Sequence, residues 1–310
     1  MSSFNAVLNV SRGQRVVRGL MSPVLAILMV SIVLTSAPAA AQQQPARGPN
    51  NGASSTAPAI DYRTARLDRR LTAVRLSSPI HLDGVLDEPD WGRAPIATHF
   101  IQNDPREGQP AASDTEVRAL YDEDAIYFGV FAKDDDPKRL IVSDIKEDFN
   151  TGGSDGIAVI IDTFHDGRNG YQFATNPAGA KWDAQIANEG RETNSDWDGV
   201  WEVSTHVGDA GWYAELRIPF RTLKFTRASV QTWGINFERR IRRLNQNSYW
   251  SPIPRVFDLQ RVSLAGTLED LRDVVPGRNL RIKPYVSSSS NKAAGRSAVN
   301  DFDGGLDVKY

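Results

Sequence analysis

The chain has 310 residues, of which 40% are apolar and 24% are charged, and its formal net charge is −2. This composition is typical of a globular protein with one large or two ordinary domains, and the acidic balance gives no reason to expect nucleic acid as a partner. The absence of cysteine excludes disulfides, a thiol nucleophile and cysteine-ligated metal.

The amino terminus has the pattern of a secretory signal peptide over residues 1–41. A positive region with Arg12, Arg15 and Arg18 precedes an apolar run at 20–34 and three small residues at 39–41. The apolar run is short for an uncleaved membrane anchor, which is the alternative. Loss of three arginines and no acidic residue changes the charge from −2 to −5. We therefore expect an exported protein of the periplasm, outer membrane or extracellular space.

The next segment, residues 42–76, is predicted to be a disordered linker or arm. Its first part is rich in Gln, Pro, Gly, Asn and Ser, and only residues 65–74 have a pattern that suits a short helix or an extended arm. The folded domain is therefore predicted to span residues 77–275.

Alternating apolar and polar residues predict the strands of this domain. The predicted strands are 79–82, 115–121, 125–133, 157–161, 171–175, 212–218 and 233–243. A helical turn capped by Asp87 is predicted to place Trp91 against the core. Short strands, frequent turns and no long amphipathic helix predict an all-β fold, an antiparallel sandwich of the jelly-roll or immunoglobulin-like type.

A second β region is predicted to begin at residues 276–310. Alternation at 280–286 is followed by a polar turn at 287–300 and a new strand pattern from 305. We interpret this segment as the first strands of a truncated, barrel-like region.

Six motifs in chain order resemble the family 9 carbohydrate-binding module, which is a β-sandwich. They lie at residues 80–91, 114–122, 126–130, 197–201, 212–220 and 233–237, and the match covers about residues 78–270. Three further motifs, at 169–171, 176–179 and 239–243, are similar to those of a subgroup in which the module precedes a C-terminal region like an outer-membrane β-barrel. The resemblance implies sugar binding, a link to carbohydrate breakdown and glycoside hydrolases, and two tryptophans around a terminal sugar. It also implies calcium as a structural ion.

The candidate sugar-binding residues combine aromatic rings with planar polar groups, which suit the faces and hydroxyls of a pyranose. Trp197 lies in a polar turn and Trp182 lies between two charged residues, although each is equally suited to packing. Tyr171 belongs to a strand of the same region. Arg239 and Arg243 stand on an otherwise apolar strand face, where a sugar hydroxyl or a structural carboxylate such as Asp162 is the expected partner.

Calcium needs about six to eight oxygen ligands. Two turns supply candidate side chains, namely Asp162, Asp166, Asn169, Asp196 and Asp198. Their spacing matches no EF-hand loop, so solvated turn carboxylates are the alternative interpretation.

No motif singles out a catalytic residue, since any of the 38 acidic residues can form a chance carboxylate pair. Three functions therefore remain open. The first is a secreted, non-catalytic carbohydrate-binding domain whose partners are an oligo- or polysaccharide and the C-terminal barrel of the same protein. The second is a structural or plug domain of that barrel, which binds no sugar. The third is a part of an O-glycosyl hydrolase, identified by two carboxylates in a cleft.

Overall fold

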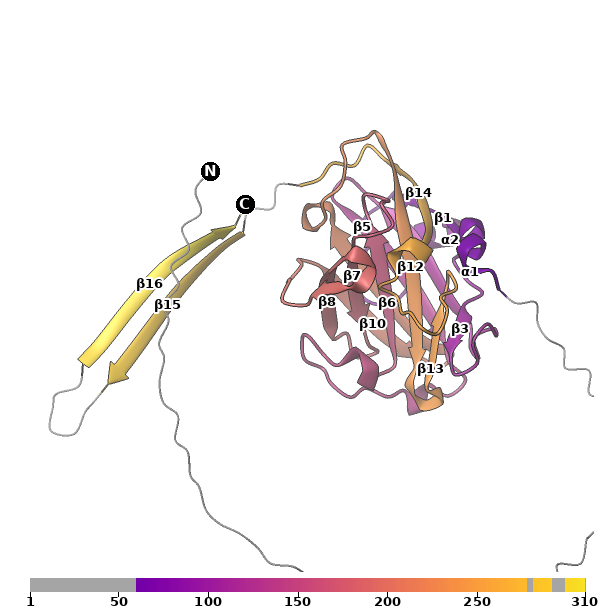
Figure 1. The fold of residues 1–310 in the computed structure, drawn as a ribbon, viewed down its shortest axis with the longest axis horizontal. Helices are drawn as coiled ribbons and strands as arrows, with labels where there is room; N and C mark the ends of the chain where they lie inside the picture. The colour runs from indigo at the N-terminus through magenta and orange to yellow at the C-terminus, as the bar shows by residue number, and fades with distance from the viewer. Residues whose placement is uncertain (1–59, 278–280, 292–298, 310) are drawn as a thin grey trace, which may run out of the picture. The chain divides into compact units, whose positions relative to one another are not determined.

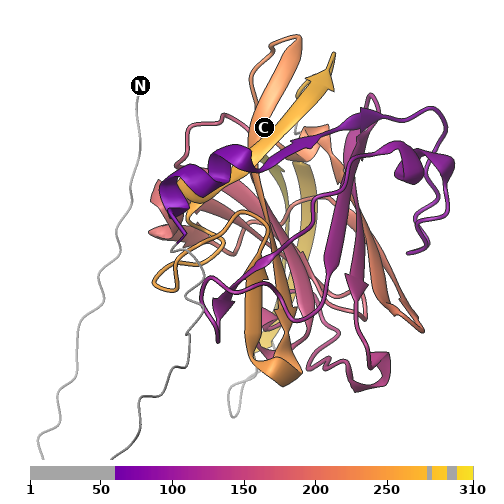
Figure 2. The ribbon, with the colours of Figure 1, turned by 90° about the vertical axis from the view of Figure 1, so that its right-hand side faces the viewer.

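Two sheets pack face to face in the computed structural model, which describes residues 60–277, 281–291 and 299–309 (Figures 1 and 2). The larger sheet has nine strands, in the order β1 (Arg70–Thr72), β14 (Gly266–Arg272), β12 (Val230–Ile241), β6 (Gly156–Asp162), β7 (Gly170–Thr175), β8 (Lys181–Ala187) and β9 (Glu192–Asn194), with β13 (Gln246–Tyr249) on β12 and β3 (Ile101–Asp104) on β13. The smaller sheet has the order β10 (Glu202–Gly208), β11 (Gly211–Pro219), β5 (Ala125–Lys133), β4 (Thr115–Tyr121) and β2 (Val74–Arg75). The prediction of an all-β sandwich is confirmed.

Helices are short and lie between the strands. The α-helices are α1 (Tyr62–Ala65) and α2 (Pro89–Arg93), and the 3₁₀ turns are η1 (Arg66–Asp68), η2 (Pro137–Arg139), η3 (Thr151–Gly153), η4 (Asn188–Gly190), η5 (Phe220–Thr222), η6 (Arg242–Leu244) and η7 (Val262–Leu264). In the part of the chain that the structure describes, no helix has the length and apolar character needed to cross a membrane.

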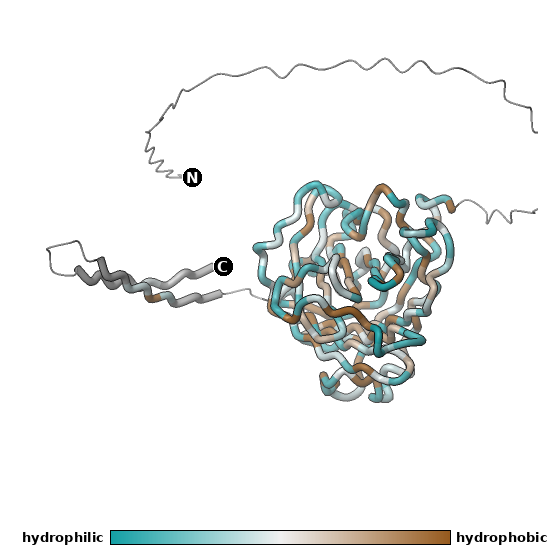
Figure 3. The backbone as a smooth tube through the Cα atoms, turned by 90° about the horizontal axis from the view of Figure 1, so that it is seen from below, coloured by the Kyte–Doolittle hydropathy of each residue, from teal (hydrophilic) through white to brown (hydrophobic). Residues whose placement is uncertain are grey.

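The main core lies between the two sheets. The predicted hairpin β4–β5 and the inner face of β11 are confirmed, and Phe128, Leu216 and Trp233 are among the fully buried side chains there. Buried and half-buried positions alternate over the first part of β4, and hydrophobic and hydrophilic residues are interspersed along the whole backbone (Figure 3). Period-two patterning therefore determines which face of each strand enters the core.

The amino-terminal boundary differs from its prediction. Residues 60–76, assigned to a disordered arm, form α1, η1, β1 and β2, and Leu71 is only 1% exposed. β1 pairs with β14 and β2 with β4, both in parallel. Five arginines are interspersed with the apolar residues of this segment, so its sequence pattern did not reveal that its backbone completes both sheets. Residues 1–59, which include the predicted signal peptide and the rest of the linker, lie outside the described residues.

Residues 79–93 cover the outer face of the smaller sheet without forming the predicted strand at 79–82. Glu88, and not Asp87, occupies the N-cap of α2, and Trp91 is 2% exposed, as predicted. The buried Glu215 of β11 holds this segment. Its carboxylate accepts hydrogen bonds from the backbone N–H groups of Asp83 and Gly84 at 2.9 and 2.8 Å, and from Trp91 Nε1 at 3.2 Å.

The hairpin formed by β15 (Arg281–Asn291) and β16 (Val299–Lys309) is a separate two-stranded sheet. Its antiparallel register runs without interruption from Arg281 opposite Lys309 to Asn291 opposite Val299. The strand predicted at 280–286 is therefore confirmed but longer, since residues 287–291, predicted as a turn, continue it. The connection at 292–298 lies outside the described residues.

Substitution of Gly84 tests how closely residues 79–93 pack on the smaller sheet. Its φ is +86°, and a Cβ there would lie 2.6 Å from the backbone carbon of Thr205. We expect Gly84→Ala to lower the unfolding free energy by about 2 kcal/mol, from left-handed strain and this clash. Gly92→Ala in α2 is the matched control, because its Cβ would meet nothing within 4 Å. Chemical denaturation measures both, and equal midpoints would contradict this account.

Candidate functional site

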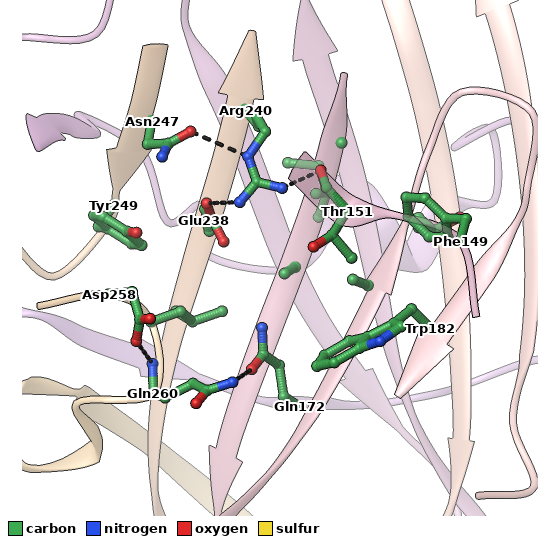
Figure 4. A pocket seen from close by; sticks show the side chains of 16 residues that line it. Phe149, Thr151, Gln172, Trp182, Glu238, Arg240, Asn247, Tyr249, Asp258 and Gln260 are labelled. Atoms are coloured by element: carbon green, nitrogen blue, oxygen red, sulfur yellow. Dashed lines mark hydrogen bonds and ion pairs between the residues drawn. The ribbon is translucent and has the colours of Figure 1, made fainter. Parts of the chain in front are cut away.

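A cavity of about 340 Å³ lies on the outer face of the nine-stranded sheet, away from the main core. Strands β12, β6, β7, β8 and β13 form its base and sides (Figure 4). The segments that carry Phe149, Thr151 and residues 258–260 close it from above. Its volume lies at the lower end of the range for small-molecule sites, which is roughly 300–1,000 Å³.

Small side chains in the centre of the sheet make the hollow. One row of paired residues crosses four strands, from Glu238 through Ala158 and Ala174 to Trp182. The two alanines lie between larger residues, and Gly156 lines the cavity beside them. The sheet therefore has a low floor with tall side chains at both ends.

Aromatic rings form the walls. The half-buried indole of Trp182 lines the cavity from β8, and the buried Tyr249 lines it from β13 (Figure 4). Phe149, 2% exposed, lies at the end near Trp182. A pyranose ring packs its apolar C–H face on such a surface.

An arginine network fixes the polar end. Arg240 donates from Nη2 to Glu238 Oε1 at 2.6 Å and from Nε to Asn247 Oδ1 at 3.1 Å. It also donates from Nη1 to the carbonyl of Thr151, which ties the covering segment to β12. Three contacts from one planar guanidinium hold both Glu238 and Asn247 in defined orientations.

A second polar group lies at the opposite rim. Gln260 donates from Nε2 to Gln172 Oε1 at 3.2 Å, and its Oε1 accepts from Thr193 Oγ1 at 2.7 Å. The backbone N–H of Gln260 donates to Asp258 Oδ1 at 2.9 Å. Planar amides and carboxylates in fixed orientations are suited to pairs of sugar hydroxyls.

The phenol of Tyr249 is neutral. Burial raises its pKa above 10, and the carboxylates of Glu238 and Asp258 raise it further, whereas Arg240 opposes them. The hydroxyl can therefore donate a hydrogen bond within the field of both carboxylates.

The structure places one of the predicted sugar-binding residues, Trp182, at the cavity. Trp197 lies outside it and packs on Tyr171 and Phe173, with ring centroids 5.2 and 5.9 Å away. Tyr171 is 8% exposed and belongs to the main core, where its hydroxyl accepts the N–H of Lys224. Trp201 is core, as expected, and its Nε1 donates to Asp183.

The two arginines predicted to bind sugar, Arg239 and Arg243, lie beside Asp134 and outside the cavity. Arg239 is 0% exposed and lies 3.9 Å from Asp134 and over the ring of Trp212. Burial lowers its pKa to about 10, while Asp155 and Asp134 oppose that change. Arg243 donates to both oxygens of Asp134 at 2.6 and 2.8 Å. A structural carboxylate is therefore the partner of Arg243, and it is Asp134 rather than the predicted Asp162. Arg239 faces the same carboxylate without a hydrogen bond among the described residues.

The predicted calcium ligands lie on two different turns. Asp162 accepts backbone N–H groups of Asp166 and Gly167, while Asp166 binds Asn169 within the β6–β7 turn. Asp196 and Asp198 belong to the connection between β9 and β10. Among the described residues, no group of three or more His, Asp or Glu side chains is arranged to hold a metal ion. Asp162 and Asp166 accept hydrogen bonds from backbone N–H groups of their own turn.

The sequence analysis missed most of the cavity, namely Phe149, Gln172, Glu238, Arg240, Asn247, Tyr249, Asp258 and Gln260. A signal was present for two of them. On β12, Glu238 and Arg240 alternate with the core-facing Phe237 and Arg239, so period two places them together on the opposite face. The loop residues carry no comparable pattern.

Two carboxylates at the β6–β7 turn, Asp162 and Asp166, have pKa values that shift in opposite directions on folding, so they should change the stability with pH in opposite directions. Burial raises the pKa of Asp162 above 3.8, so the folded state binds this proton more tightly than the unfolded chain does. Burial also acts to raise the pKa of Asp166, but hydrogen bonds from Asn169 and Arg168 outweigh it and leave that pKa below 3.8.

Relative to Asp162→Asn, the wild-type unfolding free energy should fall as pH rises through the raised pKa. Relative to Asp166→Asn, it should fall as pH decreases through the lowered pKa. Denaturant titrations between about pH 3 and pH 6 measure both slopes. Slopes of the same sign would refute the assignment.

Comparisons with known proteins agree with this architecture. The profile of the family described as "Carbohydrate family 9 binding domain-like" matches residues 82–245, which is more than half of the chain. The comparison with curated proteins gives no match.

Three solved structures are similar. A putative carbohydrate-binding protein from Bacteroides uniformis has 14% identity and a TM-score of 0.51, over 65% of this chain and 98% of its own, and supports the fold. A family 9 carbohydrate-binding module from Caldicellulosiruptor kristjanssonii is similar in two complexes. Its glucose complex has 15% identity and a TM-score of 0.45 over 67% of this chain and all of its own. Its cellotriose complex has 16% identity and a TM-score of 0.42 over 67% and 98%. On the profile match, the chain belongs to the carbohydrate family 9 binding domain-like family.

Proposed function

We propose that this chain binds carbohydrate in the cavity on the outer face of the larger sheet. The observation that carries the proposal is the pairing of the Trp182 indole with fixed planar polar groups across a floor of small residues. One pyranose face packs on the indole, while its hydroxyls bind the side chains at the two rims. Family membership supports the ligand class.

The polar groups suit vicinal hydroxyls. The second oxygens of Glu238 and Asp258 accept no hydrogen bond from the described residues. The amide nitrogens of Asn247 and Gln172 donate no hydrogen bond to the described residues. These groups offer two acceptors and two donors, and the phenol of Tyr249 adds a further donor. Each hydroxyl of a sugar donates and accepts, so the set is complementary to it.

The contacts favour binding over hydrolysis. Glycoside cleavage needs a carboxylic acid that donates a proton and a second carboxylate across the bond. Glu238 and Asp258 both line the cavity, but Glu238 accepts from Arg240 and Asp258 accepts from the backbone of Gln260. The two groups are alike in this respect, so no contact distinguishes one of them as the proton donor.

Trp182 is the first residue to change. We expect Trp182→Ala to weaken binding of glucose or a short glucan at least tenfold, because it removes the stacking surface and about 1.4 kcal/mol or more of binding free energy. Isothermal titration of the full chain measures this change.

Trp197→Ala is the matched control. Its half-buried indole packs against the core beside Phe173, outside the cavity. It should lower the thermal midpoint while leaving sugar affinity unchanged. No heat from a folded wild-type chain with any sugar would refute the proposal and favour a structural or plug role.

We also propose that the protein is exported and that the β15–β16 hairpin opens a second β region that accompanies the sandwich in the envelope. The signal-peptide pattern of residues 1–41 supports export. Each strand of the hairpin has eleven residues, the length that suits a strand of an outer-membrane barrel. In this proposal the sugar site belongs to an exported domain that accompanies the hairpin.

Expression of the full chain in a Gram-negative host tests the export proposal. We expect intact-mass analysis to find a product that begins at Gln42, because cleavage follows the small residues at 39–41. Recovery with the outer membrane rather than in the osmotic-shock fluid would support a role for the hairpin. An uncleaved cytoplasmic product would overturn both parts.

A further inference from the structure

The cavity carries a net negative charge. Three of its lining residues are charged at neutral pH, namely Glu238, Asp258 and Arg240, and their formal sum is −1. Burial raises the pKa of the Tyr249 phenol most, and the nearby carboxylates of Glu238 and Asp258 raise it further. The charge is therefore felt inside the cavity and not only at its rim.

The one cation is already used by the protein. Each nitrogen of the Arg240 guanidinium donates to a protein acceptor, which are Asn247, Glu238 and the carbonyl of Thr151. An acidic ligand would have to compete with these bonds while lying next to two carboxylates. Like charges at this distance repel, and desolvation in a cavity strengthens the repulsion.

Each of the two carboxylates, in contrast, has one oxygen that can still accept a hydrogen bond from a ligand. Glu238 uses Oε1 for Arg240, and Asp258 uses Oδ1 for the N–H of Gln260. Their other oxygens accept no hydrogen bond from the described part of the chain. The aromatic walls add to this preference, because the faces of Trp182 and Tyr249 attract a cation.

We propose that the ligand of this cavity is an amino sugar, a pyranose whose ammonium group is bound by Asp258 while its ring packs on Trp182 and its hydroxyls reach Glu238. This inference rests on the proposed sugar binding and specifies its substrate class. The ammonium donates a charge-assisted hydrogen bond to the unused Oδ2 of Asp258, while Oε2 of Glu238 remains an acceptor for a hydroxyl. The cavity accepts neutral sugars more weakly and excludes uronic acids.

A series of four monosaccharides separates charge from shape. Isothermal titration of the full chain at pH 6 and low salt compares glucosamine, N-acetylglucosamine, glucose and glucuronate. The amine, with a pKa of about 8, is protonated at this pH. We expect glucosamine to bind about tenfold more tightly than glucose, the factor that one charge-assisted hydrogen bond supplies. N-Acetylglucosamine, which has no charge at the same position, should not share this gain.

Two further conditions locate the effect. The preference for glucosamine over glucose should fall at about 0.5 M salt, because exposed Asp258 is screened. Asp258→Asn should reduce the same ratio while keeping an acceptor for Gln260. Glu202→Gln is the control, since Glu202 is an exposed carboxylate of the other sheet that pairs with Arg217. It should leave the ratio unchanged.

The outcomes distinguish this inference from the proposed function. Equal affinities for glucosamine and glucose, both lost in Trp182→Ala, would overturn the amino-sugar assignment and leave sugar binding intact. Tighter binding of glucuronate would also overturn the assignment. Binding of none of the four sugars by the folded chain would remove both.

Discussion

Strand β12 is buried on both of its faces, and this constraint organises the protein. One face packs in the sandwich core and the other forms a wall of the cavity, so every charge on residues 238–240 must be paired inside the molecule. Arg239 lies near Asp134 on the core side, while Glu238 and Arg240 pair with each other on the cavity side. The two ion pairs lie back to back across a single backbone. The same alternation that closes the core therefore also orients the polar end of the site.

The residues that define the family resemblance mostly build the fold. Glu215, Gly84 and Trp91 belong to recognisable motifs, and their contacts hold the segment that covers the smaller sheet. Asp183 similarly holds the motif at 197–201 through the N–H of Gly199 and the indole N–H of Trp201. None of these residues lines the cavity. A chain can keep every one of them and still change its ligand, because the site depends on other positions.

The sequence predicts the sheets well where one face is apolar and the other is polar. Strands β4, β5 and β11 are of this kind, and each was recognised. β8 was missed although its polar residues alternate with apolar ones, namely Trp182, Ala184 and Ile186. These apolar residues pack on the outer side of the sheet, while the buried Asp183 binds Trp201 of the main core, the reverse of the usual arrangement. The site was predicted only through Trp182. Trp197, in an equally polar context, turned out to pack on Phe173. Local sequence cannot distinguish a ring that faces a cavity from a ring that completes a core, since the difference is made by partners far along the chain.

The floor of the cavity is made by strands and its cover by loops. This difference separates the general ligand class of the site from its specificity. Ala158 and Ala174 lie in paired strands, so the depth of the floor is set by backbone register and is as rigid as the sheet. Asp258 and Gln260 lie on a loop, which tolerates substitution without loss of the core. In the proposed site, the sheet residue Trp182 is the surface for a sugar ring of any kind, whereas the loop residue Asp258 is the charge that we propose discriminates among rings. A site built in this way retains its general ligand class while its specificity changes through the cover alone.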